Sequence, residues 1–217
     1  MKDPQKFSYD GDQAEVHWDG RLCIHYGECG RASGELFVGG RQPWCQPDHS
    51  SDEEIRDVLL RCPTGALTAD FADGSDLKPE IEENQVTVTQ NGPLYLRGLL
   101  NFDGAPDDMP GTRFRAALCR CGESKNKPFC DNSHIETGFT DSGAVGESGT
   151  DHVVEAGELT IKPLVDGPVL VTGSLKITTS SGRVAWKGEK AAFCRCGASK
   201  NKPFCDGSHT EAGFESS

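Results

Sequence analysis

A stretch of sixteen residues occurs twice in this chain of 217 residues, and the two copies start 75 positions apart. Fourteen of the sixteen positions in residues 119–134 recur unchanged in residues 194–209. The same shift aligns residues 86–139 with residues 161–214 without a gap, so the repeated unit is longer than the motif. Such self-similarity indicates a duplicated structural unit.

The repeated motif carries metal-ligand chemistry, because each copy offers three thiols and one imidazole. The candidate ligands are Cys119, Cys121, Cys130 and His134, then Cys194, Cys196, Cys205 and His209. In an extended chain, residues two apart point the same way, so the Cys-x-Cys pair of each copy is placed to hold one iron. The remaining Cys and His, four residues apart, are placed to hold a second iron.

The whole motif resembles the signature of the CDGSH iron-sulfur proteins, the mitoNEET family. The second copy ends in Cys205-Asp-Gly-Ser-His209, whereas the first has Asn132 where the family has glycine. Asparagine tolerates a left-handed backbone, so ligation is expected to survive. The resemblance implies one 2Fe-2S cluster per motif, in a β-rich fold whose motifs pair as a dimer. Here the tandem copy is expected to replace the second subunit, giving a monomer with intramolecular pairing.

Within each unit, residues 94–98 and 169–173 predict a strand after a Gly-Pro turn. The Cys-rich segment is predicted to be a loop that ends at Asp131 or Asp206. Either Asp can cap a short helix that places the last Cys and the His one turn apart. Four loop residues are candidate cofactor-binding residues, because they stiffen the loop or can hydrogen-bond within the turn or to sulfur. They are Ser124, Ser199, Pro128 and Pro203.

Four further cysteines, in the N-terminal part, suggest a third cluster site. They are Cys23, Cys29, Cys45 and Cys62. Cys62 precedes a proline, as in ferredoxins, and the Cys23/Cys29 pair keeps the outer ligands of the ferredoxin run while Tyr26 stands at the middle position. Three ligands suit a 3Fe-4S cluster. Cys45 either completes a 4Fe-4S site or is buried and unligated.

The surroundings of these cysteines resemble a divergent single-cluster ferredoxin-like domain that accompanies CDGSH units. The resemblance rests on residues 23–29, 41–44 and 62–67. A helix is predicted between the last two segments, with Ser51 and Glu54 as a capping box. Its apolar face is expected to comprise Ile55, Val58, Leu59 and Cys62. That helix would deliver Cys62 to the cluster.

Charge and hydropathy exclude several classes of function. The formal net charge is -12, which disfavours a nucleic-acid partner because phosphate binding needs clustered Lys and Arg. Residues 1–13 lack the apolar core of a signal peptide, and the chain has no long apolar run, so neither export nor membrane insertion is expected. A cytoplasmic location is predicted, where thiols stay reduced and serve as metal ligands.

These features predict an α+β chain in three parts. A ferredoxin-like domain is expected over residues 1–79, a first CDGSH unit over 80–140 and a second over 153–217. Because each β-rich unit alone would expose an apolar face, the two units are expected to pack on one another about a pseudo-twofold axis.

The predicted function is non-catalytic electron transfer to a redox partner protein. A neutral His in place of a thiolate is expected to raise the reduction potential above the ~-400 mV of four-cysteine clusters, and protonation of that His to make cluster retention pH-sensitive. Cluster donation to an apo-protein acceptor, redox sensing and an electron-input role beside a reductase remain alternatives. Three Cys and one His also suit zinc, as in an interaction module. The motif cations Arg120 and Arg195, with nearby lysines, screen the negative charge of the cluster, guide an acidic redox partner, or are solvated loop charges.

Overall fold

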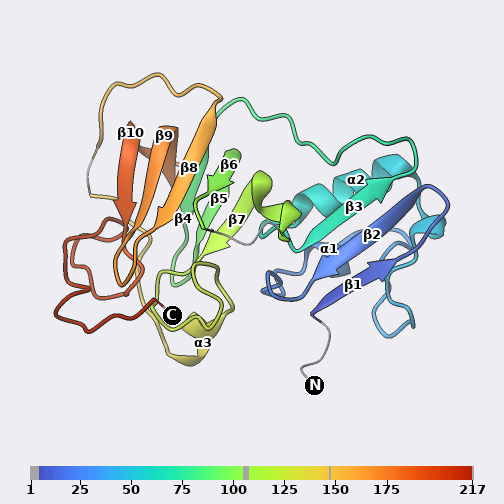
Figure 1. Ribbon diagram of the computed structural model, residues 1–217, viewed down its shortest axis with the longest axis horizontal. Helices are drawn as coiled ribbons and strands as arrows, with labels where there is room; N and C mark the ends of the chain where they lie inside the picture. Colours follow the sequence, from blue (N-terminus) through green and yellow to red (C-terminus); the bar gives the residue numbers. More distant parts are fainter. Residues whose placement is uncertain (1–4, 105–107, 147, 217) are drawn as a thin grey trace.

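The computed structural model describes residues 5–104, 108–146 and 148–216. The chain forms two sheets that lie beside one another (Figure 1). The N-terminal sheet is antiparallel in the order β1-β2-β3. Its strands are β1 (Lys6–Tyr9), β2 (Ala14–Asp19) and β3 (Leu67–Phe71). Between β2 and β3 lie α1 (Glu28–Arg31), the 3-10 helix η1 (Pro47–His49) and α2 (Asp52–Arg61).

Helix α2 confirms the helix predicted from the sequence. The Ser51 side chain accepts a hydrogen bond from the Glu54 backbone N–H, and the Glu54 carboxylate accepts one from the Ser51 N–H, so the capping box is formed. Three of the four residues of the predicted apolar face, Ile55, Val58 and Leu59, are buried against the sheet. Cys62 is the C-cap of the helix, which carries it to the edge of the N-terminal core.

The second sheet contains seven strands drawn from both repeats. Its order is β6-β8-β9-β4-β5-β7, and β10 also pairs with β9. The first repeat contributes β4 (Gln85–Val88), β5 (Leu94–Arg97), β6 (Leu99–Phe102) and β7 (Arg115–Leu118), with the 3-10 helix η2 (Pro110–Arg113) before β7. The second repeat contributes β8 (Glu158–Pro163), β9 (Val169–Thr179) and β10 (Val184–Phe193). Strands β5 and β9 occupy the two segments where the sequence predicts strands.

The two repeats exchange strands reciprocally. In the parallel ladder of β6 with β8, Phe102 is opposite Ile161. The repeat equivalents of Phe102 and Ile161 are Ile177 and Val86, and these two residues are opposite one another in the parallel ladder of β9 with β4. The sequence analysis expected the two units to pack on one another. The structure joins them more closely, because each unit completes the sheet of the other through main-chain hydrogen bonds. Strands of both repeats share one apolar core, in which Leu94, Leu159, Leu175 and their neighbours are fully buried.

The short helix predicted after each motif forms only once among the described residues. In the first repeat it is α3 (Ser133–Glu136), whose N-cap is Asn132. The predicted cap, Asp131, instead accepts hydrogen bonds from the Ser133 N–H at 3.0 Å and the Lys125 N–H at 2.8 Å, so it ties the loop to the helix start. In the second repeat residues 208–213 form turns, and the prediction of a helix there is wrong. Asp206 keeps the same two bonds, which hold the loop without a helix.

Mixed α and β content agrees with the predicted α+β class, although strands dominate. Residues 72–84 and 140–152 connect the parts without helix or strand over their described positions. The Gly, Ser and Asp content of residues 72–80 and 140–152 is typical of loops. None of the described helices has the length and apolar character needed to cross a membrane.

Candidate metal centres

Strand β7 leads directly into the first ligand set. Cys119 follows its last residue and is buried, and the Cys119 N–H donates to the Pro128 carbonyl at 2.9 Å, which closes the loop. The Sγ atoms of Cys119 and Cys121 are 3.6 Å apart. Two thiolates on one tetrahedral metal lie about 3.7 Å apart, so this pair fits one iron.

The other half of the first site fits a second iron. The Cys130 Sγ lies 3.4 Å from Nδ1 of His134, so the sulfur and this ring nitrogen could bind the same iron. Burial lowers the pKa of His134, and Arg120 lowers it further. The imidazole is therefore held neutral, the form that coordinates metals. Burial raises the pKa of Cys130 to about 11, so its thiol needs a cation to lose its proton.

The second site repeats the Cys-x-Cys half of this arrangement. The Sγ atoms of Cys194 and Cys196 are 3.6 Å apart. Nδ1 of His209 is buried and has no hydrogen-bond partner in the structure. A buried polar nitrogen without a partner is costly, and a metal bond would satisfy it. Cys205, the fourth ligand candidate, is half-buried.

Ligand spacing argues against a single zinc ion at either motif. Among the described residues, only Glu15, His17 and Asp70 bring three potential ligand atoms within 4.8 Å of one another. The four ligand atoms of a tetrahedral zinc site all lie within about 4 Å of each other. In the first motif the ligand side chains instead form two separate pairs, Cys119 with Cys121 and Cys130 with His134, as two bridged irons require.

The serines of the loops stabilise the turns. Ser124 Oγ donates to the Phe129 carbonyl at 2.6 Å and accepts from the Asn126 N–H at 3.0 Å. Ser199 does the same with the Phe204 carbonyl at 2.7 Å. Of the two roles considered for these hydroxyls, the structure shows bonding within the turn. Backbone N–H groups bond the sulfurs instead: Glu123 N–H reaches Cys121 Sγ at 3.5 Å.

The arginines inside the motifs are structural. Arg120 and Arg195 are 2% and 3% exposed, so the interpretation as solvated loop charges is wrong for them. The guanidinium of Arg120 forms an ion pair of 2.8 Å with Asp141 and also donates to two backbone carbonyls. Arg195 donates to the carbonyls of Gly167 and Leu164. Each arginine therefore anchors a ligand loop to the preceding turn of its unit.

The two ligand loops meet at one end of the second sheet (Figure 1). Cys121 and Cys196 form an antiparallel bridge between the repeats. At Gly122 a Cβ atom would lie 3.0 Å from the Cys196 carbonyl oxygen, and at Gly197 one would lie 2.8 Å from that of Cys121. Glycine at these positions lets the two loops approach backbone to backbone.

The N-terminal site has three half-buried cysteines, Cys23, Cys29 and Cys62. Burial is the main cause that raises the pKa of the Cys29 thiol, and the neighbouring Cys62 and Cys23 thiols add to it. Cys62 Sγ lies 3.5 Å from the Thr64 hydroxyl. Cys23 and Cys62 pack against the core of the second sheet, so this site faces the first repeat.

Cys45 has a different environment. It is 1% exposed, pairs with Phe37 through the backbone and belongs to the apolar core of the N-terminal part. Burial raises the pKa of its thiol to about 12. Cys29 lies close enough to raise it further. Cys45 thus belongs to the apolar core beside the site, whereas Cys23, Cys29 and Cys62 lie at the edge of that core.

Comparison with protein families agrees with this geometry. The family described as "Iron-binding zinc finger CDGSH type" matches residues 91–135 and 166–210, and "Divergent 4Fe-4S mono-cluster" matches residues 9–70. The chain belongs to the CDGSH iron-sulfur family. Its two CDGSH motifs follow a divergent single-cluster ferredoxin-like domain in the sequence. The matches to both families indicate that the chain is an iron-sulfur protein.

Curated relatives cover separate parts of this CDGSH protein. "Uncharacterized protein YjdI" of Escherichia coli strain K12 is 37% identical over 59 residues, which are 27% of this chain and 78% of the relative. "CDGSH iron-sulfur domain-containing protein 2 homolog" of Drosophila grimshawi is 74% identical over 23 residues, 11% of this chain and 17% of the relative. No solved structure matches the chain significantly.

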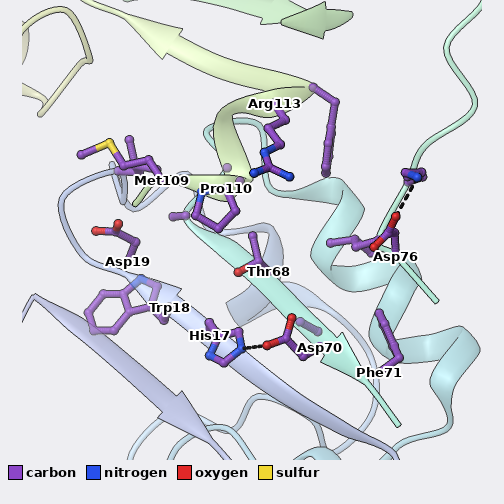
Figure 2. A pocket seen from close by; sticks show the side chains of 18 of the residues that line it. His17, Trp18, Asp19, Thr68, Asp70, Phe71, Asp76, Met109, Pro110 and Arg113 are labelled. Carbon is purple, nitrogen blue, oxygen red and sulfur yellow. Dashed lines mark hydrogen bonds and ion pairs between the residues drawn. The ribbon is translucent and has the colours of Figure 1, made fainter. Parts of the chain in front are cut away.

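A groove of about 700 Å³ lies away from the ligand sets. Figure 2 shows His17 and Asp70 on the outer face of the N-terminal sheet, joined by a hydrogen bond of 3.1 Å, with Met109, Pro110 and Arg113 of the first CDGSH unit across from them. None of the described residues that line the groove is a cysteine, so it is separate from the metal centres.

Sequence reasoning did not predict which residues join the N-terminal site to the first CDGSH unit. They are Ile24, Tyr95, Arg115, Asn126 and Asn132. Three of them differ between the repeats, where Tyr95, Arg115 and Asn132 correspond to Leu170, Lys190 and Gly207. These differences between the two repeats were the sequence signal that could have indicated the contact.

Proposed function

We propose that this protein is a non-catalytic electron carrier with three iron-sulfur centres. Each CDGSH motif holds a 2Fe-2S cluster through three Cys and one His, and the N-terminal domain holds a further cluster. The observation that carries the proposal is the division of the first ligand set into two pairs, 3.6 Å and 3.4 Å apart. A bound iron-sulfur cluster takes up and releases one electron.

Several groups of the chain favour reversible reduction at these sites. Backbone N–H groups of Asn132 and Gly207 approach the sulfurs of Cys130 and Cys205 at 3.5 Å and 3.4 Å. Such bonds, like a neutral imidazole ligand, stabilise the more negative reduced state and raise the potential.

Pairing within one chain supports a monomer. The reciprocal ladders of β6 with β8 and of β4 with β9, and the bridge between Cys121 and Cys196, join the repeats as two subunits of a dimer would be joined.

We propose Cys23, Cys29 and Cys62 as ligands of a 3Fe-4S cluster, and Cys45 as the residue that would complete a 4Fe-4S cluster if its thiol turns out of the core.

Cluster donation to an apo-protein is a second candidate function. It is favoured by the exposure of the second motif, where Cys205 is half-buried while its counterpart Cys130 is 3% exposed. A ligand set nearer to solvent releases its metal more readily. A redox partner protein or a cluster acceptor is therefore the proposed partner.

The proposed function is tested by iron, sulfide and zinc analysis combined with electron paramagnetic resonance (EPR). We expect about four irons from the repeats and about three or four from the N-terminal site, and stepwise one-electron reduction by dithionite that air reverses without loss of iron. Loss of iron during the cycle, with transfer to an apo-ferredoxin, would favour cluster donation. A colourless protein containing zinc would refute both functions.

Acid is expected to release the CDGSH clusters selectively. A proton on Nδ1 of His134 or His209 competes with iron for the same lone pair, so lowering the pH removes one ligand. The visible absorbance of these clusters should persist at about pH 8 and bleach at about pH 5.5. The N-terminal cluster, whose proposed ligands are all cysteines, serves as the internal control. Equal absorbance of the CDGSH clusters at both pH values would contradict the prediction.

A further inference from the structure

The ligand loop of the N-terminal site is hydrogen-bonded to the first CDGSH motif. Asn132 Nδ2 donates to the Ile24 carbonyl at 2.6 Å, one residue after Cys23. Asn126 Nδ2 donates to the Arg21 carbonyl, also at 2.6 Å. Asn132 stands in the left-handed region, with φ 73°, between the ligands Cys130 and His134. The departure of this motif from Gly-Ser-His thus provides a contact between the two ligand loops.

Apolar and aromatic side chains fill the space beside these bonds. Ile24 is buried with Ala117 and Cys130, and Tyr95 packs against the three of them. The ring of Tyr26, at the position of the missing middle ligand, stands edge-on to Tyr95 at 5.8 Å between centroids. Tyr95 thus contacts the first ligand set through the cluster that includes Cys130, and the N-terminal ligand loop through Tyr26.

A buried arginine fixes the same contact from the other side. Arg115 of β7 is 4% exposed and donates through Nη2 to the Leu67 carbonyl at 2.6 Å. Its Nε and Nη1 have no hydrogen-bond partner in the structure. Two buried donor nitrogens therefore stay unpaired beside β3, at the contact between the N-terminal part and the first CDGSH unit.

The second CDGSH motif has different residues at these positions. A Cβ atom at Gly207, the counterpart of Asn132, would meet no atom within 4 Å. The second motif touches the first through the bridge between Cys121 and Cys196. The three ligand sets thus follow one another in space in the order N-terminal, first CDGSH and second CDGSH.

We propose that the first CDGSH unit is the internal redox partner of the N-terminal site, with Ile24, Tyr95 and Asn132 holding the two ligand sets in contact. Electrons pass between the N-terminal and second CDGSH sites by way of the first. This relay rests on the electron-carrier function proposed above. In each step the donor site loses one electron and the acceptor site gains it, so no further reactant takes part. An external one-electron reductant, dithionite in the experiment, supplies the first electron.

Matched ligand variants of the full chain test the order of the relay. In the fully reduced protein, the EPR signal that Cys62→Ala abolishes belongs to the N-terminal site; it is recorded in parallel mode for a 3Fe-4S cluster, whose reduced form has integer spin, and in perpendicular mode for a 4Fe-4S cluster. We expect this signal to show magnetic broadening and fast relaxation in the parent protein. The broadening should be lost in Cys130→Ala and kept in the equivalent variant Cys205→Ala. Iron analysis checks that each of these two variants loses about two irons and keeps the others.

A second pair of variants tests the contact residues. Tyr95→Leu with Asn132→Gly gives the first unit the residues that the second unit already has, so the fold and the ligands are retained. We expect weaker broadening of the N-terminal signal at unchanged iron content. Gly207→Asn adds an amide to the second motif. A Cβ atom at this position would have no neighbour within 4 Å, so this variant is expected to leave the signal unchanged.

The outcomes separate the relay from the carrier function. If all clusters reduce reversibly but the N-terminal signal is unbroadened, or responds to Cys205→Ala rather than to Cys130→Ala, the relay is refuted and the carrier function stands. Unchanged broadening in the Tyr95/Asn132 variant refutes the role of these residues. If the clusters are lost on reduction, the carrier function itself fails.

Discussion

Replacing Arg120 by methionine is expected to lower the free energy of unfolding by about 3 to 5 kcal/mol, because removal of one partner leaves a largely buried carboxylate without its charge partner. Arg120 forms the 2.8 Å ion pair with Asp141, whose side chain is only 13% exposed. The same guanidinium donates to the carbonyls of Gly92 and Thr89, which would also lose a partner. For a chain of this length the midpoint of thermal unfolding should fall by about 10 °C.

Lys125→Met is the matched control for Arg120→Met. Lys125 is an exposed cation of the same loop, and its replacement should change the free energy of unfolding by less than about 0.5 kcal/mol. Urea unfolding followed by circular dichroism measures both variants. Similar stability of Arg120→Met and Lys125→Met would show that the buried ion pair does not anchor the first ligand loop.

Gly111→Ala is expected to disrupt the contact between the N-terminal part and the first CDGSH unit. A Cβ atom on Gly111 would lie 1.9 Å from the Gly65 carbonyl oxygen, and one on Gly65 would lie 2.3 Å from the Gly111 oxygen. Both obstacles are backbone atoms, so the two parts must move apart. Overpacking of this kind costs about 3 kcal/mol or more.

The test of Gly111→Ala is thermal unfolding together with limited proteolysis of residues 72–84. We expect a lower first midpoint and faster cleavage of this connection. Gly39→Ala is the control, because a Cβ atom there would meet nothing within 4 Å. If Gly111→Ala and the control unfold and are cleaved alike, the close approach of Gly65 and Gly111 does not hold the two parts together.

The ligands could be found from the sequence because metal binding is local. Cys119 and Cys121 are two residues apart, and Cys130 and His134 are four apart, so short-range geometry alone brings each pair to within 3.6 Å and 3.4 Å. Helix α2 was predictable for the same reason, since its capping box lies within four consecutive residues. Short sequence separations leave the chain few alternatives.

Long-range pairing was not predictable. Alternation of apolar residues indicates a strand at residues 85–88, but nothing in that segment specifies a parallel ladder with β9, some ninety residues away. The burial of Arg120 was hidden for a similar reason: its partners Thr89, Gly92 and Asp141 are 21 to 31 residues distant in the chain. A charge that is paired only in three dimensions looks like a surface charge in the sequence.

For Asn132 the sequence predicted the backbone conformation but not the contact of the side chain. Its left-handed backbone was expected from the family motif and is present, with φ 73°. The hydrogen bond from its side chain to Ile24 was not expected, because the two residues are 108 positions apart. Similarly, the apolar surroundings of Cys45 depend on Leu36, Phe37 and the sheet behind them, and the spacing of the cysteines contains no information about that burial.

Strand exchange within one polypeptide has a genetic consequence. When two identical subunits exchange strands, every substitution appears on both sides of the axis, so a residue gained for docking one neighbour is also imposed on the opposite copy. Covalent fusion removes that constraint, because each half is encoded separately. The first half can acquire Tyr95, Arg115 and Asn132 while the second keeps Leu170, Lys190 and Gly207. Duplication thus preserves the architecture of a symmetric pair and allows its two halves to specialise.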